Sequence, residues 1–170
     1  MTRSQQEPAH GADDATMMRI GQAIMLHRGG DREEARNRLT ALWAEAEDSG
    51  HLFHRCTIAH YLADTQDDPA EELRWDLRAL SAAEALTGER ARWPEHRRAV
   101  RSLYPALHLS LASDHARLGD EAAARRELGR ARGSLAALAD DPHGERLREE
   151  IERLARRLTE GPGPGGYARD

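Results

Sequence analysis

Apolar residues recur at intervals of three and four along almost the whole chain, which places them on one side of successive α-helices. One such stripe consists of Ala35, Leu39, Leu42 and Ala46. The stripes are separated by Gly29-Gly30 and Gly119-Asp120, where glycine accepts the left-handed conformation that ends a helix and aspartate caps the next one. The pattern predicts an all-α fold.

We expect six helices in three successive pairs, followed by a seventh. Their stripes cover residues 14–28, 35–46, 51–65, 69–83, 100–118, 124–138 and 147–158. Asp68 and Pro69 suit the cap and the first position of the fourth helix, and a loop is expected over 87–94. Pro105 falls inside the fifth helix, where proline removes a hydrogen bond, so a kink or a restart is expected.

The two ends of the chain differ from this pattern. Residues 1–13 carry no apolar stripe, and the tail 160–170 is rich in glycine and proline. We therefore expect a flexible N-terminus, a single helical-repeat domain over 14–159 and a disordered tail. The seventh helix is apolar on one side and charged on the other, which is typical of a terminal capping helix.

Composition excludes several kinds of chemistry. All 25 basic residues are arginine, so Schiff-base catalysis, pyridoxal-phosphate enzymes and the lysine-containing phosphate loop are ruled out. Cys56 is the only cysteine, which rules out an internal disulfide and a multi-cysteine zinc site. We expect no catalytic residue and no cofactor.

Charge and hydropathy indicate the cellular compartment and exclude some classes of partner. The net charge of -5 argues against a nucleic-acid binder. The first residues lack the apolar core of a signal peptide, and no stretch approaches the roughly 20 apolar residues that span a membrane. The expectation is a cytoplasmic protein that does not bind a membrane.

Small residues recur where paired helices must touch. Ala112, Ala124 and Ala131 are separated by twelve and seven residues, and Ala23, Ala35 and Leu42 repeat this spacing. The middle unit is degenerate, because Ala59 and Ala79 are one residue too far apart. This pattern resembles the tetratricopeptide repeat, whose period is about 34 residues. The segments HYLADTQDDPAEELRWDLRAL and LYPALHLSLASDHARLGDEAAARREL are also similar to those of small actinobacterial members.

The resemblance covers about residues 14–158 and implies a right-handed superhelix of about three antiparallel helical hairpins with a C-terminal capping helix. It also implies a concave groove lined by the first helix of each hairpin. The candidate groove residues are Ile24, Arg28, Phe53, Cys56, His60, Asp64, Leu109, Ser113 and Arg117. The implied function is a non-enzymatic protein–protein interaction module that binds a peptide or protein partner, with self-association into a homodimer as a further form of binding. A transcription factor or a kinase is compatible as the partner, although no residue requires it.

Cys56, His60 and Asp64 follow one another at intervals of four, so one helical face presents a thiol, an imidazole and a carboxylate. The alternative function is therefore a small-molecule-binding protein or an enzyme with a pocket at these residues, in which His60 activates the thiolate. A binding role of His60 and Asp64 and ordinary packing of this helix are both favoured over catalysis, because catalytic triads usually assemble from separated elements and cysteine is often a small buried hydrophobe.

Other clusters are interpreted as structural. His51, His54, Cys56 and His60 are close in sequence, but His60 does not share the face of the first two histidines, so no metal site is predicted. We expect His108 and His115 to lie in the interior or at its edge. Trp43 and Trp75 are expected to pack in the core, and the arginine-rich stretch 89–101 is expected to be solvated.

Overall fold

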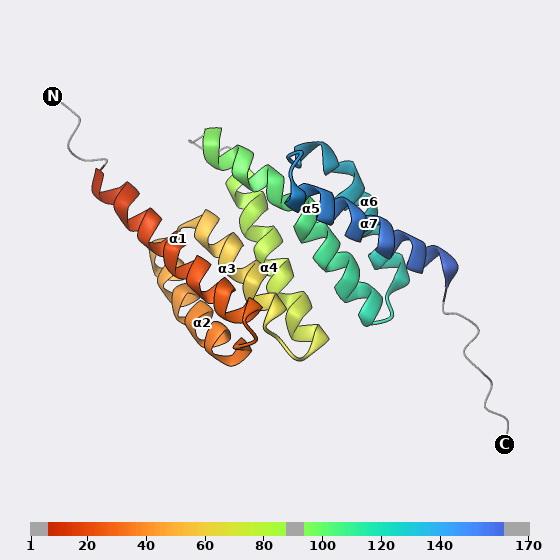
Figure 1. Ribbon diagram of the computed structural model, residues 1–170, viewed down its shortest axis with the longest axis horizontal. Helices are drawn as coiled ribbons and strands as arrows, with labels where there is room; N and C mark the ends of the chain where they lie inside the picture. Colours follow the sequence, from red (N-terminus) through yellow and green to blue (C-terminus); the bar gives the residue numbers. More distant parts are fainter. Residues whose placement is uncertain (1–6, 88–93, 162–170) are drawn as a thin grey trace, which may run out of the picture. The chain divides into compact units, whose positions relative to one another are not determined.

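The computed structural model describes residues 7–87 and 94–161, with side chains from 11 to 87 and from 101 to 161. Within these ranges the chain forms helices and no strand (Figure 1), which confirms the all-α prediction. The elements are α1 (Glu7–Arg28), α2 (Arg32–Ser49), α3 (Leu52–Asp64), α4 (Pro69–Thr87), α5 (Pro94–Arg117), α6 (Glu121–Gly133), the 3₁₀ turn η1 (Leu135–Ala137) and α7 (Pro142–Glu160). Helix α1 begins ahead of the expected start near Asp14.

The chain divides into two compact units, residues 1–97 and 98–170. The first contains α1 to α4, and the second contains most of α5 together with α6, η1 and α7. A single domain over 14–159 stays a prediction.

Successive helices pack against one another in the first unit, and α1 also contacts α3. The turns between them have the predicted capping chemistry. The Asp31 carboxylate accepts a hydrogen bond from the Glu34 amide at 3.3 Å, and Gly30 has a φ of 94°. His51 caps α3 in the same way, because its Nδ1 accepts the His54 amide at 3.3 Å.

The core of the first unit lies between α1, α2 and α3. Its buried members are Ile20, Ala23, Leu39, Leu42, Ala46, Ile58 and Leu62. Trp43 and Trp75 pack against this cluster with their rings edge to face and their centroids 5.1 Å apart. The expected core role of both tryptophans is confirmed.

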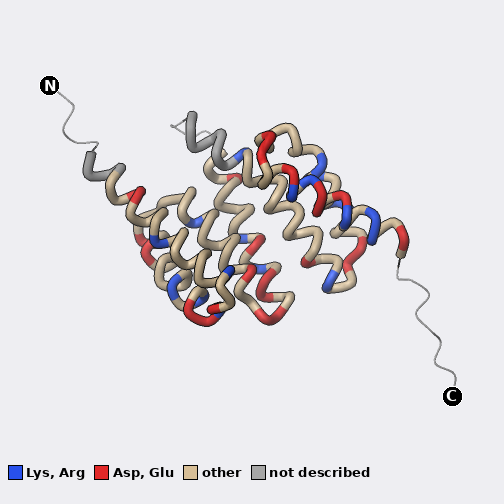
Figure 2. The backbone as a smooth tube through the Cα atoms, viewed as in Figure 1, with Lys and Arg blue, Asp and Glu red and all other residues tan. Residues whose placement is uncertain are grey.

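Charged residues stabilise the turns at one end of the first unit. Acidic residues gather in the first turns of α2 and α4 (Figure 2). Their negative charges are attracted by the positive end of the helix dipole. The Arg36 guanidinium donates to the Thr65 carbonyl and lies 3.1 Å from an Asp67 carboxylate oxygen. This contact ties α2 to the end of α3.

The second unit has its own core. Its buried members are Leu109, Ala112, Leu128, Ala131, Leu147, Ile151, Leu154 and Ala155. Helix α5 continues through Pro105 without the predicted restart. Asp120 caps α6, as predicted, by accepting the Ala123 amide at 3.0 Å. Helix α7 packs on α6 through its apolar side, and its charged side remains exposed.

In the described part of the chain, every helix is too short or too polar to cross a lipid bilayer.

Candidate functional site

The candidate site of the first unit is the side on which α1 meets α3. We call it the α1–α3 face and define it by Ile24, Arg28, His60, Tyr61 and Asp64. Ile24 and Arg28 lie one turn apart on α1, and His60 and Asp64 lie one turn apart on α3. The charges of Arg28 and Asp64 both act on Tyr61. The structure therefore brings four predicted residues together and adds Tyr61.

His60 pairs with a carboxylate that the sequence analysis missed. Its Nδ1 lies 3.3 Å from Oδ1 of Asp76, which is on α4 and only 1% exposed. Burial by itself lowers the pKa of His60, but the hydrogen bond to Asp76, the charge of Asp76 and the charge of Asp64 together raise it. His60 thus favours its charged form more than an ordinary histidine does.

A signal for Asp76 exists in the sequence. It lies three residues after Leu73 and four before Leu80, so the apolar stripe of α4 carries it towards the interior. A carboxylate at a buried helical position requires a partner, which indicates that a histidine or arginine of another helix faces it.

Asp64 and Tyr61 extend the charged part of the α1–α3 face. Loss of hydration raises the pKa of the Asp64 carboxyl, His60 lowers it, Asp76 raises it and His27 lowers it, with a net increase. Burial raises the pKa of the Tyr61 hydroxyl, against the effect of Arg28. The face thus contains acidic, basic and phenolic groups in electrostatic contact.

Cys56 has no part in this charged cluster. Its side chain is completely buried, and burial raises the pKa of the thiol to about 12. The thiol is therefore protonated at neutral pH, and His60 is oriented towards Asp76 instead. This geometry argues against the nucleophile hypothesis. Phe53, one turn before Cys56, is half-buried.

An open depression of about 960 Å³ adjoins the face. Its apolar lining comes mainly from α1, including Met18 and Met25, each 66% exposed. The lining residues are Met18, Gly21, Gln22, Ile24, Met25, Leu26, Arg28, Gly29, Asp31, Arg38 and Tyr61. Two predicted groove residues, Ile24 and Arg28, therefore border a surface that is mostly apolar.

The remaining predicted groove residues belong to the second unit. Leu109 is buried in the core of that unit, Ser113 is half-buried and Arg117 is exposed. The Arg117 guanidinium lies 3.6 Å from the Asp114 carboxylate. The participation of Leu109, Ser113 and Arg117 in one groove with the α1–α3 face stays a prediction.

The second unit contains a histidine–carboxylate pair of its own. His108 Nδ1 lies 2.7 Å from Glu127 Oε2, and both side chains are nearly buried. Tyr104 stacks on the His108 ring. His108 therefore lies at the edge of the interior, as predicted, and His115 is half-buried. The arginine-rich stretch 89–101 lies outside the described side chains except for Arg101, which is exposed.

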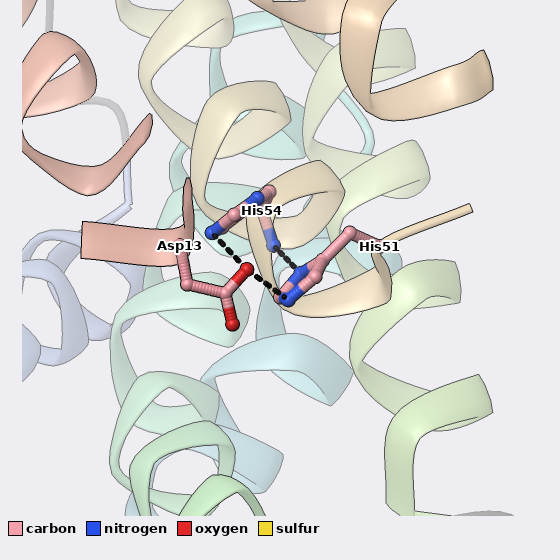
Figure 3. Close-up of side chains that lie close together, drawn as sticks. All are labelled: Asp13, His51 and His54. Carbon is pink, nitrogen blue, oxygen red and sulfur yellow. Dashed lines mark hydrogen bonds and ion pairs between the residues drawn. The ribbon is translucent and has the colours of Figure 1, made fainter. Parts of the chain in front are cut away.

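A second cluster of the first unit combines Asp13 of α1 with His51 and His54 at the start of α3 (Figure 3). Asp13 Oδ1 lies 3.2 Å from His51 Nε2 and 4.0 Å from His54 Nε2. The two imidazole rings are stacked with their centroids 3.7 Å apart. Sequence spacing paired the histidines but gave no indication of Asp13.

No family model, curated protein or solved structure matches the chain in the comparisons made.

Proposed function

We propose that the chain is a non-enzymatic interaction module of the tetratricopeptide-like kind, which binds a peptide or protein segment on the α1–α3 face. The right-handed superhelix is part of this proposal. It is supported by the small residues of the repeat pattern, because Ala23, Ala35, Ala59, Ala112, Ala124 and Ala131 are all completely buried. Such residues let paired helices approach closely.

The observation that carries the proposal is the combination of an apolar depression with charged groups at its border. The exposed methionines of α1 offer adaptable apolar contact, and Tyr61 offers a ring with a polar end. Arg28 suits a carboxylate of a partner, whereas Asp64 suits a basic group. A segment with an apolar side chain between charged residues fits this arrangement.

The alternative of an enzyme based on Cys56 gains no support from the geometry, because the thiol is buried and its pKa is about 12. A partner of regulatory type and self-association both remain compatible with the proposed face.

The test is affinity capture with the full chain and with the double variant Arg28→Ala/Asp64→Ala. Both side chains are exposed, so the fold should remain intact, and circular dichroism checks this. The control is Glu47→Ala/Arg126→Ala, which removes exposed charges outside the α1–α3 face. We expect the double variant to lose a partner that the wild type and the control retain, and titration of a peptide from that partner should show at least tenfold weaker binding. An identical set of bound proteins for all three chains would contradict the proposal.

A further inference from the structure

We propose that Asp13, His51 and His54 form a binding site for a divalent transition-metal ion of the Zn²⁺ class. The three residues belong to the first unit and come from two helices that are distant in sequence, α1 and the start of α3. In Figure 3 both imidazole rings lie beside the same carboxylate. The proposal is independent of the α1–α3 face.

The distances favour a shared ion. Asp13, His51 and His54 each offer one ligand atom, and the three atoms lie within 4.8 Å of one another. Zinc binds imidazole nitrogen and carboxylate oxygen at about 2.0–2.2 Å, so two ligands of one ion lie roughly 3–3.5 Å apart. The pair of Asp13 and His51 already has this separation at 3.2 Å, whereas the pair of Asp13 and His54 must close from 4.0 Å. For this second pair, the oxygen–nitrogen distance must shorten by less than one ångström.

The donor set selects the class of ion. Imidazole nitrogen suits Zn²⁺, Co²⁺ and Ni²⁺, whereas Ca²⁺ and Mg²⁺ prefer oxygen ligands throughout. Two histidines and one carboxylate leave at least one coordination position for water. His54 is only 5% exposed, so one ligand is already dehydrated and held in place by the fold.

Metal binding requires a change that can be observed directly. His51 Nδ1 accepts the His54 amide, so a neutral His51 carries its proton on Nε2, which faces Asp13. An ion on Nε2 takes the place of that proton, which moves to Nδ1, and the amide of His54 loses its acceptor. The two rings, now 16° from parallel, must also splay so that both lone pairs point at one ion. The lost hydrogen bond is long, at 3.3 Å, and is weak beside a metal–imidazole bond.

The experiment uses the full chain after treatment with a chelator. Zn²⁺ is titrated by calorimetry, Co²⁺ by its visible absorption, and the imidazole nitrogens are followed by ¹⁵N NMR. We expect one ion per chain, a higher melting temperature with Zn²⁺ and the transfer of the His51 proton to Nδ1. Absence of a saturable site in the wild type would overturn the proposal.

Variants assign the site to these residues. Asp13→Asn keeps the volume of a half-exposed side chain. His51→Asn introduces a residue that caps helices well, so the cap of α3 is retained. We expect each to weaken Zn²⁺ binding at least tenfold while the helical content is unchanged. His143→Ala, at an exposed histidine of α7, is the matched control and should bind as the wild type does. Equal affinity of the wild type and Asp13→Asn would overturn the assignment.

Discussion

Each unit pairs a histidine with a buried carboxylate of the following helix, but the two carboxylates are satisfied differently. In the second unit, Glu127 uses one oxygen for His108 at 2.7 Å and the other for Arg130 at 2.6 Å. In the first unit, Asp76 contacts His60 at 3.3 Å through one oxygen, and its other oxygen, also buried, accepts no hydrogen bond from the described residues.

The comparison shows that residue types alone do not decide how a buried charge behaves. The Glu127 carboxylate has two basic partners, which together offset its loss of hydration. Among the described residues the Asp76 carboxylate has one such partner, so more of its desolvation cost remains uncompensated. We therefore expect the pair of Asp76 and His60, which is a residue of the α1–α3 face, to respond more strongly to pH and to substitution.

The largest effect should come from the two cores themselves. Ile58 and Ile151 are completely buried, one in each unit. Truncation to alanine should reduce the free energy of unfolding by about 2–5 kcal/mol in either case, because the lost transfer energy and the cavity add. Urea unfolding measures both variants, and a loss below about 1 kcal/mol in either one would contradict its core position.

The single cysteine belongs to the first unit and reports on it alone. Burial raises the pKa of Cys56 from 9.0 to about 12, so its thiolate fraction at neutral pH is about a thousandfold lower. Reaction with a thiol reagent should be slower than that of a free thiol by at least this factor, since burial also blocks access. The rate is followed by absorbance, with the urea-unfolded chain as control. Rapid labelling of the folded chain would restore the nucleophile hypothesis.

The His60 pair should make stability depend on pH. The folded pKa of His60 lies above its ordinary value of 6.5, so the stabilisation is complete below pH 6.5 and is lost as the pH rises through the folded pKa. Asp76→Asn removes the largest contributions that raise the pKa of His60, and burial, whose effect exceeds that of the Asp64 charge, should then lower it.

NMR titration of the His60 ring measures its pKa in the wild type and in Asp76→Asn. Urea unfolding between pH 5.5 and about 8 measures how the stability depends on pH. Glu127→Gln is the control, because it alters the pair of the other unit. An unchanged His60 titration in Asp76→Asn would show that the contact with Asp76 does not govern this histidine.

The smallest effects should come from two exposed arginine–glutamate pairs. Arg19 and Glu45 join α1 to α2, and Arg132 and Glu152 join α6 to α7. All four side chains are about half exposed, so water and salt screen the attraction. Replacement of either arginine with alanine should change the free energy of unfolding by less than about 1 kcal/mol in thermal or urea unfolding. A larger loss that resists high salt would reveal a packing role of the arginine stem.

The helices could be predicted from the sequence because their signals are local. The stripe of α2, the caps at Asp31 and Asp120 and the start of α4 at Pro69 depend on residues within one or two turns. The same is true of the tryptophans, whose size in alanine-rich helices indicates core packing. The lack of lysine and the single cysteine likewise limited the chemistry without any knowledge of the fold.

The partners of the polar groups were decided only by the tertiary structure. Spacing along α3 aligned Cys56, His60 and Asp64, but the fold buried the thiol and turned His60 towards Asp76 of another helix. Asp13 likewise meets His51 and His54 only because the start of α3 packs beside α1. Helix periodicity determines which side of a helix a residue occupies, whereas the packing of helices determines which residue of another helix it meets.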